Sequence, residues 1–77
     1  MDNTATFEIV REIGKIRPAG REYTRELNLV SWNGRPPKYD IREWNAGHSR
    51  MTKGLTFSTE ELDLIIELYL KDREANG

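Results

Sequence analysis

The sequence predicts an α+β fold in which a four-stranded antiparallel sheet is followed by one C-terminal helix, assembled as a homodimer. Four short segments rich in β-branched and aromatic residues are separated by turn residues, and the C-terminal segment repeats apolar side chains at helical spacing. The order β-β-β-β-α gives an antiparallel sheet with one helix packed on one face. The 77 residues are expected to form a single domain, 1–77, with its core at about 7–73.

The four strands are expected at 7–16, 21–32, 38–44 and 53–57. In the first strand the alternation of apolar residues slips near Val10, and Gly14 indicates a bulge. Between the second and third strands, Asn33 and Gly34 supply positive φ for a turn, and two prolines stop the ladder after it. A loop at 45–49 leads to the short fourth strand.

The C-terminal helix has the clearest start signal in the chain. Ser58 and Glu61 have the spacing of a capping box. The residues that follow form an apolar stripe at helical spacing: Leu62, Ile65, Ile66 and Tyr69. Leu64 and Leu68 lie on a second flank and Leu70 widens the first, so the apolar arc is broader than one sheet face needs to cover. Either the helix is deeply buried or it is shared with a second subunit, and we favour the second, with the stripe as the dimer interface.

The small size of the chain supports this preference. A domain of this length buries only about 60% of its unfolded surface, so it usually needs a disulfide, a metal or a partner subunit. The sequence has no cysteine and a single histidine, His48, which excludes disulfides, thiolate sites and histidine metal clusters. Oligomerisation is the stabilising device that remains.

We expect a binding protein rather than an enzyme, with no cofactor, metal or small-molecule substrate. His48 lies in a loop beside Ser49, with no carboxylate close to it in sequence, and such a histidine is typically solvent-exposed. The glycines of the turns do not form a phosphate-binding fingerprint. No apolar run approaches the ~20 residues of a membrane span, and the N-terminus lacks a basic segment, so we expect a cytoplasmic protein without a membrane partner.

Charge is distributed unevenly although the net charge is only −1. Residues 15–53 contain nine Lys and Arg against four Asp and Glu, a local balance of +5. From residue 58 onward, two bases face six acids, a balance of −4. This asymmetry is typical of a protein in which one surface attracts a polyanion.

Strand parity shows where that surface is expected. A turn symmetric about Arg35 pairs Leu29 with Ile41 and puts one set of residues on the core face: Tyr23, Leu27, Leu29, Tyr39, Ile41, Leu55 and Phe57. The opposite, helix-free face then carries Asn28, Val30, Trp32, Lys38, Asp40, Arg42 and Trp44. Aromatic rings beside cations suit single-stranded nucleic acid, because unpaired bases stack on the rings while Lys and Arg follow the phosphates. On the residues alone, the tryptophans could equally fill a second small core, fill the dimer contact or form a protein-docking surface.

Three segments carry a family resemblance: Val30-Ser31, Asp40-Ile41-Arg42-Glu43-Trp44 and Lys53-Gly54-Leu55-Thr56-Phe57-Ser58. In this order they resemble the C-terminal domain of Positive Cofactor Four, a transcriptional coactivator. The longer string from Glu26 to Arg42 resembles the bacterial YdbC-like branch of that family, and the resemblance covers about residues 7 to 70. It implies a dimer of four-stranded sheets, each backed by a helix. Such a dimer binds single-stranded or unwound DNA largely without sequence preference, in transcription, replication or repair, and RNA stays open as a second ligand.

The resemblance also implies roles for individual residues. Arg42 matches a DNA-contacting arginine of the third strand, Trp44 matches the aromatic pair that follows it, and Lys53 matches the lysine that opens the fourth strand. Lys38 and Trp32 flank a turn that is shorter than in the eukaryotic domain. Glu26 stands where the family has a basic residue, so Arg25 or Arg21 is expected to replace that contact.

Overall fold

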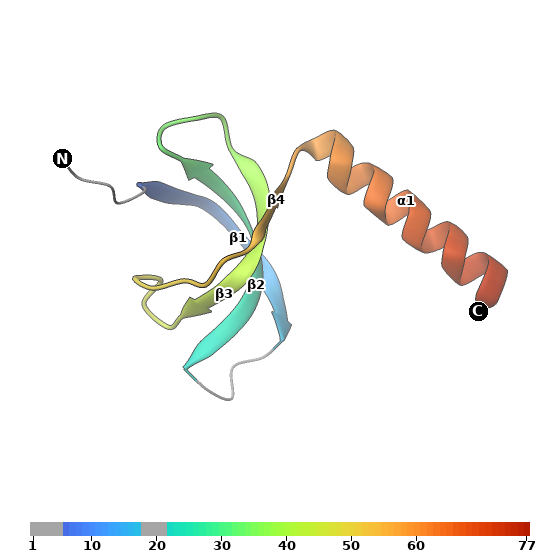
Figure 1. Ribbon diagram of the computed structural model, residues 1–77, viewed down its shortest axis with the longest axis horizontal. Coiled ribbons are helices and arrows are strands. Elements are labelled where there is room, and N and C mark those ends of the chain that lie inside the picture. Colours follow the sequence, from blue (N-terminus) through green and yellow to red (C-terminus); the bar gives the residue numbers. More distant parts are fainter. Residues whose placement is uncertain (1–5, 18–21) are drawn as a thin grey trace.

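The structure is a computed structural model that describes residues 6–17 and 22–77. It contains β1 (Phe7–Arg17), β2 (Tyr23–Trp32), β3 (Lys38–Asn45), β4 (Leu55–Phe57) and α1 (Thr59–Asn76). The strands pair antiparallel in the order β1-β2-β3-β4, and α1 follows the last strand (Figure 1). The predicted sheet-then-helix fold is therefore confirmed.

The turn between β2 and β3 is built by Asn33 and Gly34, as expected. Both have positive φ, 54° and 75°, and the Arg35 amide donates to the Trp32 carbonyl at 2.9 Å. The register differs from a turn symmetric about Arg35, because Leu29 pairs with Tyr39 and not with Ile41. This shift is two residues long. Since side chains alternate with a period of two, the faces of both strands stay as predicted.

β1 is irregular in more places than its sequence suggests. Its register against β2 shifts between Ile9 and Arg11 and between Glu12 and Gly14, which confirms the expected slip and bulge. A third shift lies between Lys15 and Arg17. Each bulge bends the strand and increases its twist. Figure 1 shows the result, a strongly twisted sheet whose strand ends curve away from α1, so that the side facing away from the helix is concave.

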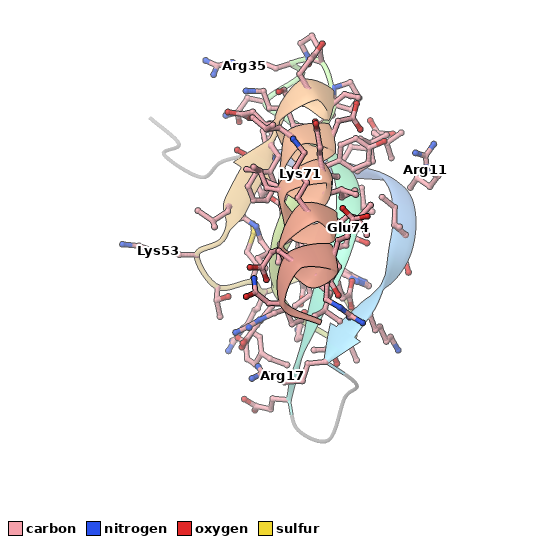
Figure 2. The ribbon with its side chains drawn as sticks, turned by 90° about the vertical axis from the view of Figure 1, so that its right-hand side faces the viewer. Arg11, Arg17, Arg35, Lys53, Lys71 and Glu74 are labelled. Atoms are coloured by element: carbon pink, nitrogen blue, oxygen red, sulfur yellow. The ribbon has the colours of Figure 1, made fainter. Side chains whose placement is uncertain are left out.

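The helix begins with the predicted capping box. The Ser58 hydroxyl accepts from the Glu61 amide at 3.1 Å, and the Ser58 amide donates to the Glu61 carboxylate at 2.8 Å. After this start, α1 extends away from the sheet and approaches only β3 and β4 (Figures 1 and 2). No residue of α1 is buried. No helix in the described part of the chain is long and apolar enough to cross a membrane.

The most buried side chains lie on the sheet face opposite to the one predicted as the core. The expected core face is only partly covered, and Leu55 on it is 66% exposed. The most buried side chains lie on the other face: Val30, Trp44 and Asp40 are 0% exposed and Asn28 is 1% exposed. Two physical reasons account for this. The concave side of a strongly curved sheet crowds its own side chains together, and the splayed helix does not cover the convex side.

Candidate nucleic-acid interface

The concave face consists of the even-numbered residues of β2 and β3. The register pairs Val30 with Lys38, Asn28 with Asp40, Glu26 with Arg42 and Thr24 with Trp44. Trp32 follows Val30 at the end of the same row. Both tryptophans, Lys38 and Arg42 therefore share one face, as the strand parity predicts.

Trp44 does not offer its ring to a ligand. Its side chain is 0% exposed, and its ring lies 5.1 Å from the ring of Phe7 and 5.4 Å from that of His48. The expectation of an exposed Trp44 is wrong for a single subunit. Phe7 covers the tryptophan from β1, so Trp44 belongs to the second small core that the sequence left open as an alternative.

Trp32 occupies a different environment. Its ring touches Phe7, with centroids 5.8 Å apart, and the Arg42 guanidinium lies 4.5 Å from its centroid. This cation–π contact fixes both side chains. Trp32 is partly exposed and remains an aromatic surface at the rim of the concave face.

Arg42 is held by a second, stronger contact. Its Nε and Nη2 donate to the two carboxylate oxygens of Asp40, both at 2.7 Å, in a bidentate pair. Asp40 is fully buried and the Arg42 side chain is 13% exposed. Asp40 therefore balances much of the charge of Arg42, and the guanidinium serves as a rigid, stacked group more than as a free cation.

Gly54 allows the segment before β4 to lie directly against Arg42, because it has no side chain. A Cβ at position 54 would lie 2.3 Å from the Ile41 carbonyl oxygen and 2.4 Å from the Arg42 Cβ. Arg42 also donates to the carbonyl of Thr52 at 3.4 Å. The segment that carries Lys53 is thus laid directly against Arg42, while Lys53 itself projects outward (Figure 2).

A hollow of about 300 Å³ lies beside Trp32. It is lined by Trp32, Arg35, Pro36, Lys38, Arg42 and Thr56. Arg35 and Lys38 are exposed, so two solvated cations border one aromatic ring and the paired Arg42. Trp32, Lys38 and Arg42 are predicted site residues, whereas Arg35 is a site residue that the sequence-based prediction does not include. Its position in the turn between the two strands that carry Trp32 and Lys38 could have identified it as a site residue.

Two further expected contacts lie elsewhere or cannot be placed. Arg25 is on the opposite parity, where it pairs with Glu43 at 2.9 Å, and Arg17 contacts the same carboxylate. Arg25 is therefore not brought to the hollow beside Trp32, because its charge is used to tie β2 to β3. Arg21 lies outside the described residues.

The other end of the concave face is a polar network. Glu26 Oε1 lies 2.8 Å from His48 Nε2 and accepts a hydrogen bond from the side-chain Nδ2 of Asn28 at 3.1 Å. Glu26 is distant from His48 in sequence, which is why no carboxylate was expected beside the histidine. His48 is only partly exposed, in contrast to the solvent-exposed loop residue predicted from sequence. Within residues 6–17 and 22–77, no group of three or more His, Cys, Asp or Glu side chains is arranged to hold a metal ion.

The predicted dimer stripe lies on α1 and is largely uncovered. Leu62 is partly buried, whereas Ile65, Ile66 and Tyr69 are about half-exposed in the single subunit. Leu64, Leu68 and Leu70 are exposed as well, so apolar residues occupy more than one side of the helix. The apolar arc is therefore wider than the sheet covers, as its sequence indicates.

A twisted antiparallel sheet with an aromatic and cationic hollow on its helix-free side is typical of sheet proteins that bind nucleic acids. Comparisons with known sequences identify the family within this class. The sequence profile of the Transcriptional Coactivator p15 (PC4) family matches residues 21–68. An uncharacterized protein of Treponema pallidum (strain Nichols) is 40% identical over 62 residues, which is 80% of this chain and 73% of that protein.

The chain belongs to the Transcriptional Coactivator p15 (PC4) family. The profile spans β2, β3, β4 and the first half of α1, and so includes all the residues that line the hollow beside Trp32. Membership indicates nucleic-acid binding and a transcription-related role. It also confirms the resemblance at the level of the family.

Proposed function

We propose that this protein binds single-stranded DNA at the hollow beside Trp32, through a base stacked on the ring and phosphates held by the neighbouring cations. The observation that carries the proposal is the juxtaposition of the partly exposed Trp32 ring with the cations of Arg35 and Lys38 in one hollow. Family membership supports it independently. Its role would be in transcription, or at the single strands exposed by replication or repair.

Single strands suit this hollow better than duplex. A base can stack on Trp32 only if its face is free, and duplex DNA hides the faces of its bases. The cations stand beside the ring and can follow the phosphates on either side of a stacked base. Arg42, which is paired with Asp40 and stacked on Trp32, holds the ring in place.

We further propose that the working unit is a homodimer formed through α1. In a single subunit the helix buries no residue, and its apolar side chains Leu64, Ile65, Ile66, Leu68 and Leu70 are exposed together with Leu55 of β4. So many exposed apolar side chains on one helix indicate an interaction site. A second copy is the natural partner, because its own helix and sheet carry the same uncovered surface and the contact can be self-complementary.

We propose that the protein acts by binding and not as an enzyme. The groups around the hollow are cations, an aromatic ring and a threonine, which recognise a ligand without supplying a nucleophile and base in one place. The histidine is held against Glu26 and Trp44 in a packed network.

Salt-dependent binding tests the main proposal. A fluorescein-labelled oligo-dT should bind more tightly than a duplex of equal length at one salt concentration. Lys38→Ala should weaken the binding and reduce the slope of log affinity against log salt by about 0.7, because one phosphate is no longer neutralised. Lys71→Ala, which removes the same charge from the exposed helix (Figure 2), is the matched control and should leave the slope unchanged.

Two results would contradict the proposal. An equal decrease of slope in both variants would show that only net charge matters, and tighter binding to duplex would remove the stacking role of Trp32. A single-stranded RNA of the same sequence in the same assay decides whether RNA is an equal ligand.

A further inference from the structure

The polar end of the concave face contains Glu26, Asn28 and His48, none of which lines the hollow beside Trp32. We propose that Glu26 and Asn28 make this protein favour cytosine and adenine, which carry an exocyclic amino group where thymine and uracil carry a carbonyl oxygen. The inference rests on the proposed binding of single strands and adds a base preference to it.

Two hollows lie at this end of the sheet, and Glu26 lines both. One, of about 190 Å³, is bordered by Glu26, Asn28 and the β1 segment from Glu12 to Lys15. The other, of about 390 Å³, is bordered by Glu26, His48 and Thr24 among others. A strand bound at the Trp32 hollow and running along β2 would reach them, because Trp32, Asn28 and Glu26 belong to the same row of side chains.

The hydrogen bonds of this network leave acceptors without partners. Asn28 is 1% exposed, and its Nδ2 donates to Glu26 Oε1 at 3.1 Å. This contact fixes which end of the amide is the donor. The carbonyl oxygen Oδ1 has no hydrogen-bond partner among the described residues. A buried acceptor without a partner reduces stability, so a ligand that supplies a donor there is favoured.

Glu26 is held in the same way. His48 Nε2 and Asn28 Nδ2 both contact Oε1, so the carboxylate is fixed from two sides. An ionised carboxylate only accepts hydrogen bonds, and two oxygens provide more acceptor sites than these two contacts use. Its negative charge repels phosphate, so this end of the face suits the edge of a base and not the backbone.

The chemistry of the bases follows from these acceptors. An exocyclic amino group offers two N–H donors, which match acceptors on two neighbouring side chains. Cytosine and adenine carry such a group, whereas guanine and thymine carry a carbonyl oxygen in the corresponding place, and thymine has a methyl group beside it. Uracil carries the same carbonyl oxygen. Facing Asn28 Oδ1 and the Glu26 carboxylate, that oxygen would meet further acceptors and be disfavoured.

Oligo-dC and oligo-dU of equal length are the sharpest pair of probes, because both bases are pyrimidines without a methyl group. Fluorescence anisotropy at one salt concentration should give about tenfold tighter binding of oligo-dC by the wild-type protein. Glu26→Gln should bring the two affinities to within about threefold, because the new amide can donate to the uracil oxygen. Glu8→Gln is the matched control: it removes the same charge from an exposed residue of β1 that pairs with Ser31 on the opposite parity, and it should keep the preference.

A second measurement avoids any folding defect of the Glu26 variant. In the wild-type protein, the NMR signals of the Asn28 side-chain amide should shift with oligo-dC and stay in place with oligo-dU. Equal affinities for the two oligonucleotides would overturn the base preference and leave single-strand binding intact. A preference that survives in a folded Glu26→Gln variant would also overturn it. No binding of either oligonucleotide would overturn the proposed function, and the base preference with it.

Discussion

Replacing the two tryptophans separates the two roles that the structure gives them. Trp44 is fully buried between Phe7 and His48, so Trp44→Ala removes a complete core side chain. Trp32 lies partly exposed at the hollow, so Trp32→Ala removes a stacking surface. We expect the first change to lower stability strongly and the second to lower affinity for single strands.

The magnitudes follow from these environments. Truncating a buried tryptophan to alanine costs about 3–5 kcal/mol. A domain of this size loses about 4–8 °C in Tm per kcal/mol, so Trp44→Ala should melt at least about 12 °C below the wild type. Base stacking on an aromatic ring is worth about 1–3 kcal/mol, so Trp32→Ala should weaken binding of oligo-dT about five- to 150-fold.

Thermal unfolding followed by circular dichroism and anisotropy with labelled oligo-dT measure both quantities. All variants need the same protein concentration, because subunit association contributes to the apparent stability. Trp44→Phe is the control for volume and should recover part of the decrease in Tm. If Trp44→Ala melts within a few degrees of the wild type and loses DNA affinity, its ring is a binding surface and the assignment of Trp44 to the core is wrong.

Three further changes test other parts of the structure. Ile66 is 49% exposed in one subunit, so Ile66→Glu should be well tolerated by a monomer but should dissociate a dimer built on α1. Sedimentation of the wild type at about twice 9.0 kDa and of the variant at half that mass would support the dimer, and a monomeric wild type would refute it. Gly54→Ala should displace the chain from Arg42, because the new Cβ would lie 2.3 Å from a backbone oxygen, and both Tm and oligo-dT affinity should fall; unchanged values would contradict the close approach. Ser58→Ala removes the capping box and should cost about 0.5–2 kcal/mol in denaturant unfolding without changing affinity, and a decrease in affinity instead would link the cap to the binding face.

The sequence by itself determined the features that depend on neighbouring residues. Alternating apolar residues and the Asn33-Gly34 turn defined the strands, and the spacing of Ser58 and Glu61 defined the helix start. Strand parity put Trp32, Lys38 and Arg42 on one face even though the predicted register was two residues off. Parity is insensitive to that error because side chains alternate with a period of two.

Only the tertiary structure decided which face is crowded and which cations are paired with acids. Three bulges in β1 bend the sheet, so Phe7 comes to lie over Trp44 and the concave face becomes the more buried one. The same curvature and pairing bring Glu26 to His48, groups that are far apart along the chain. Arg25 and Arg42 are both cations in sequence, yet each is paired with an acid, whereas Arg35 and Lys38 border the hollow beside Trp32. Local patterns cannot predict these outcomes, because burial and pairing depend on how small bends add up along four strands and on contacts between distant segments.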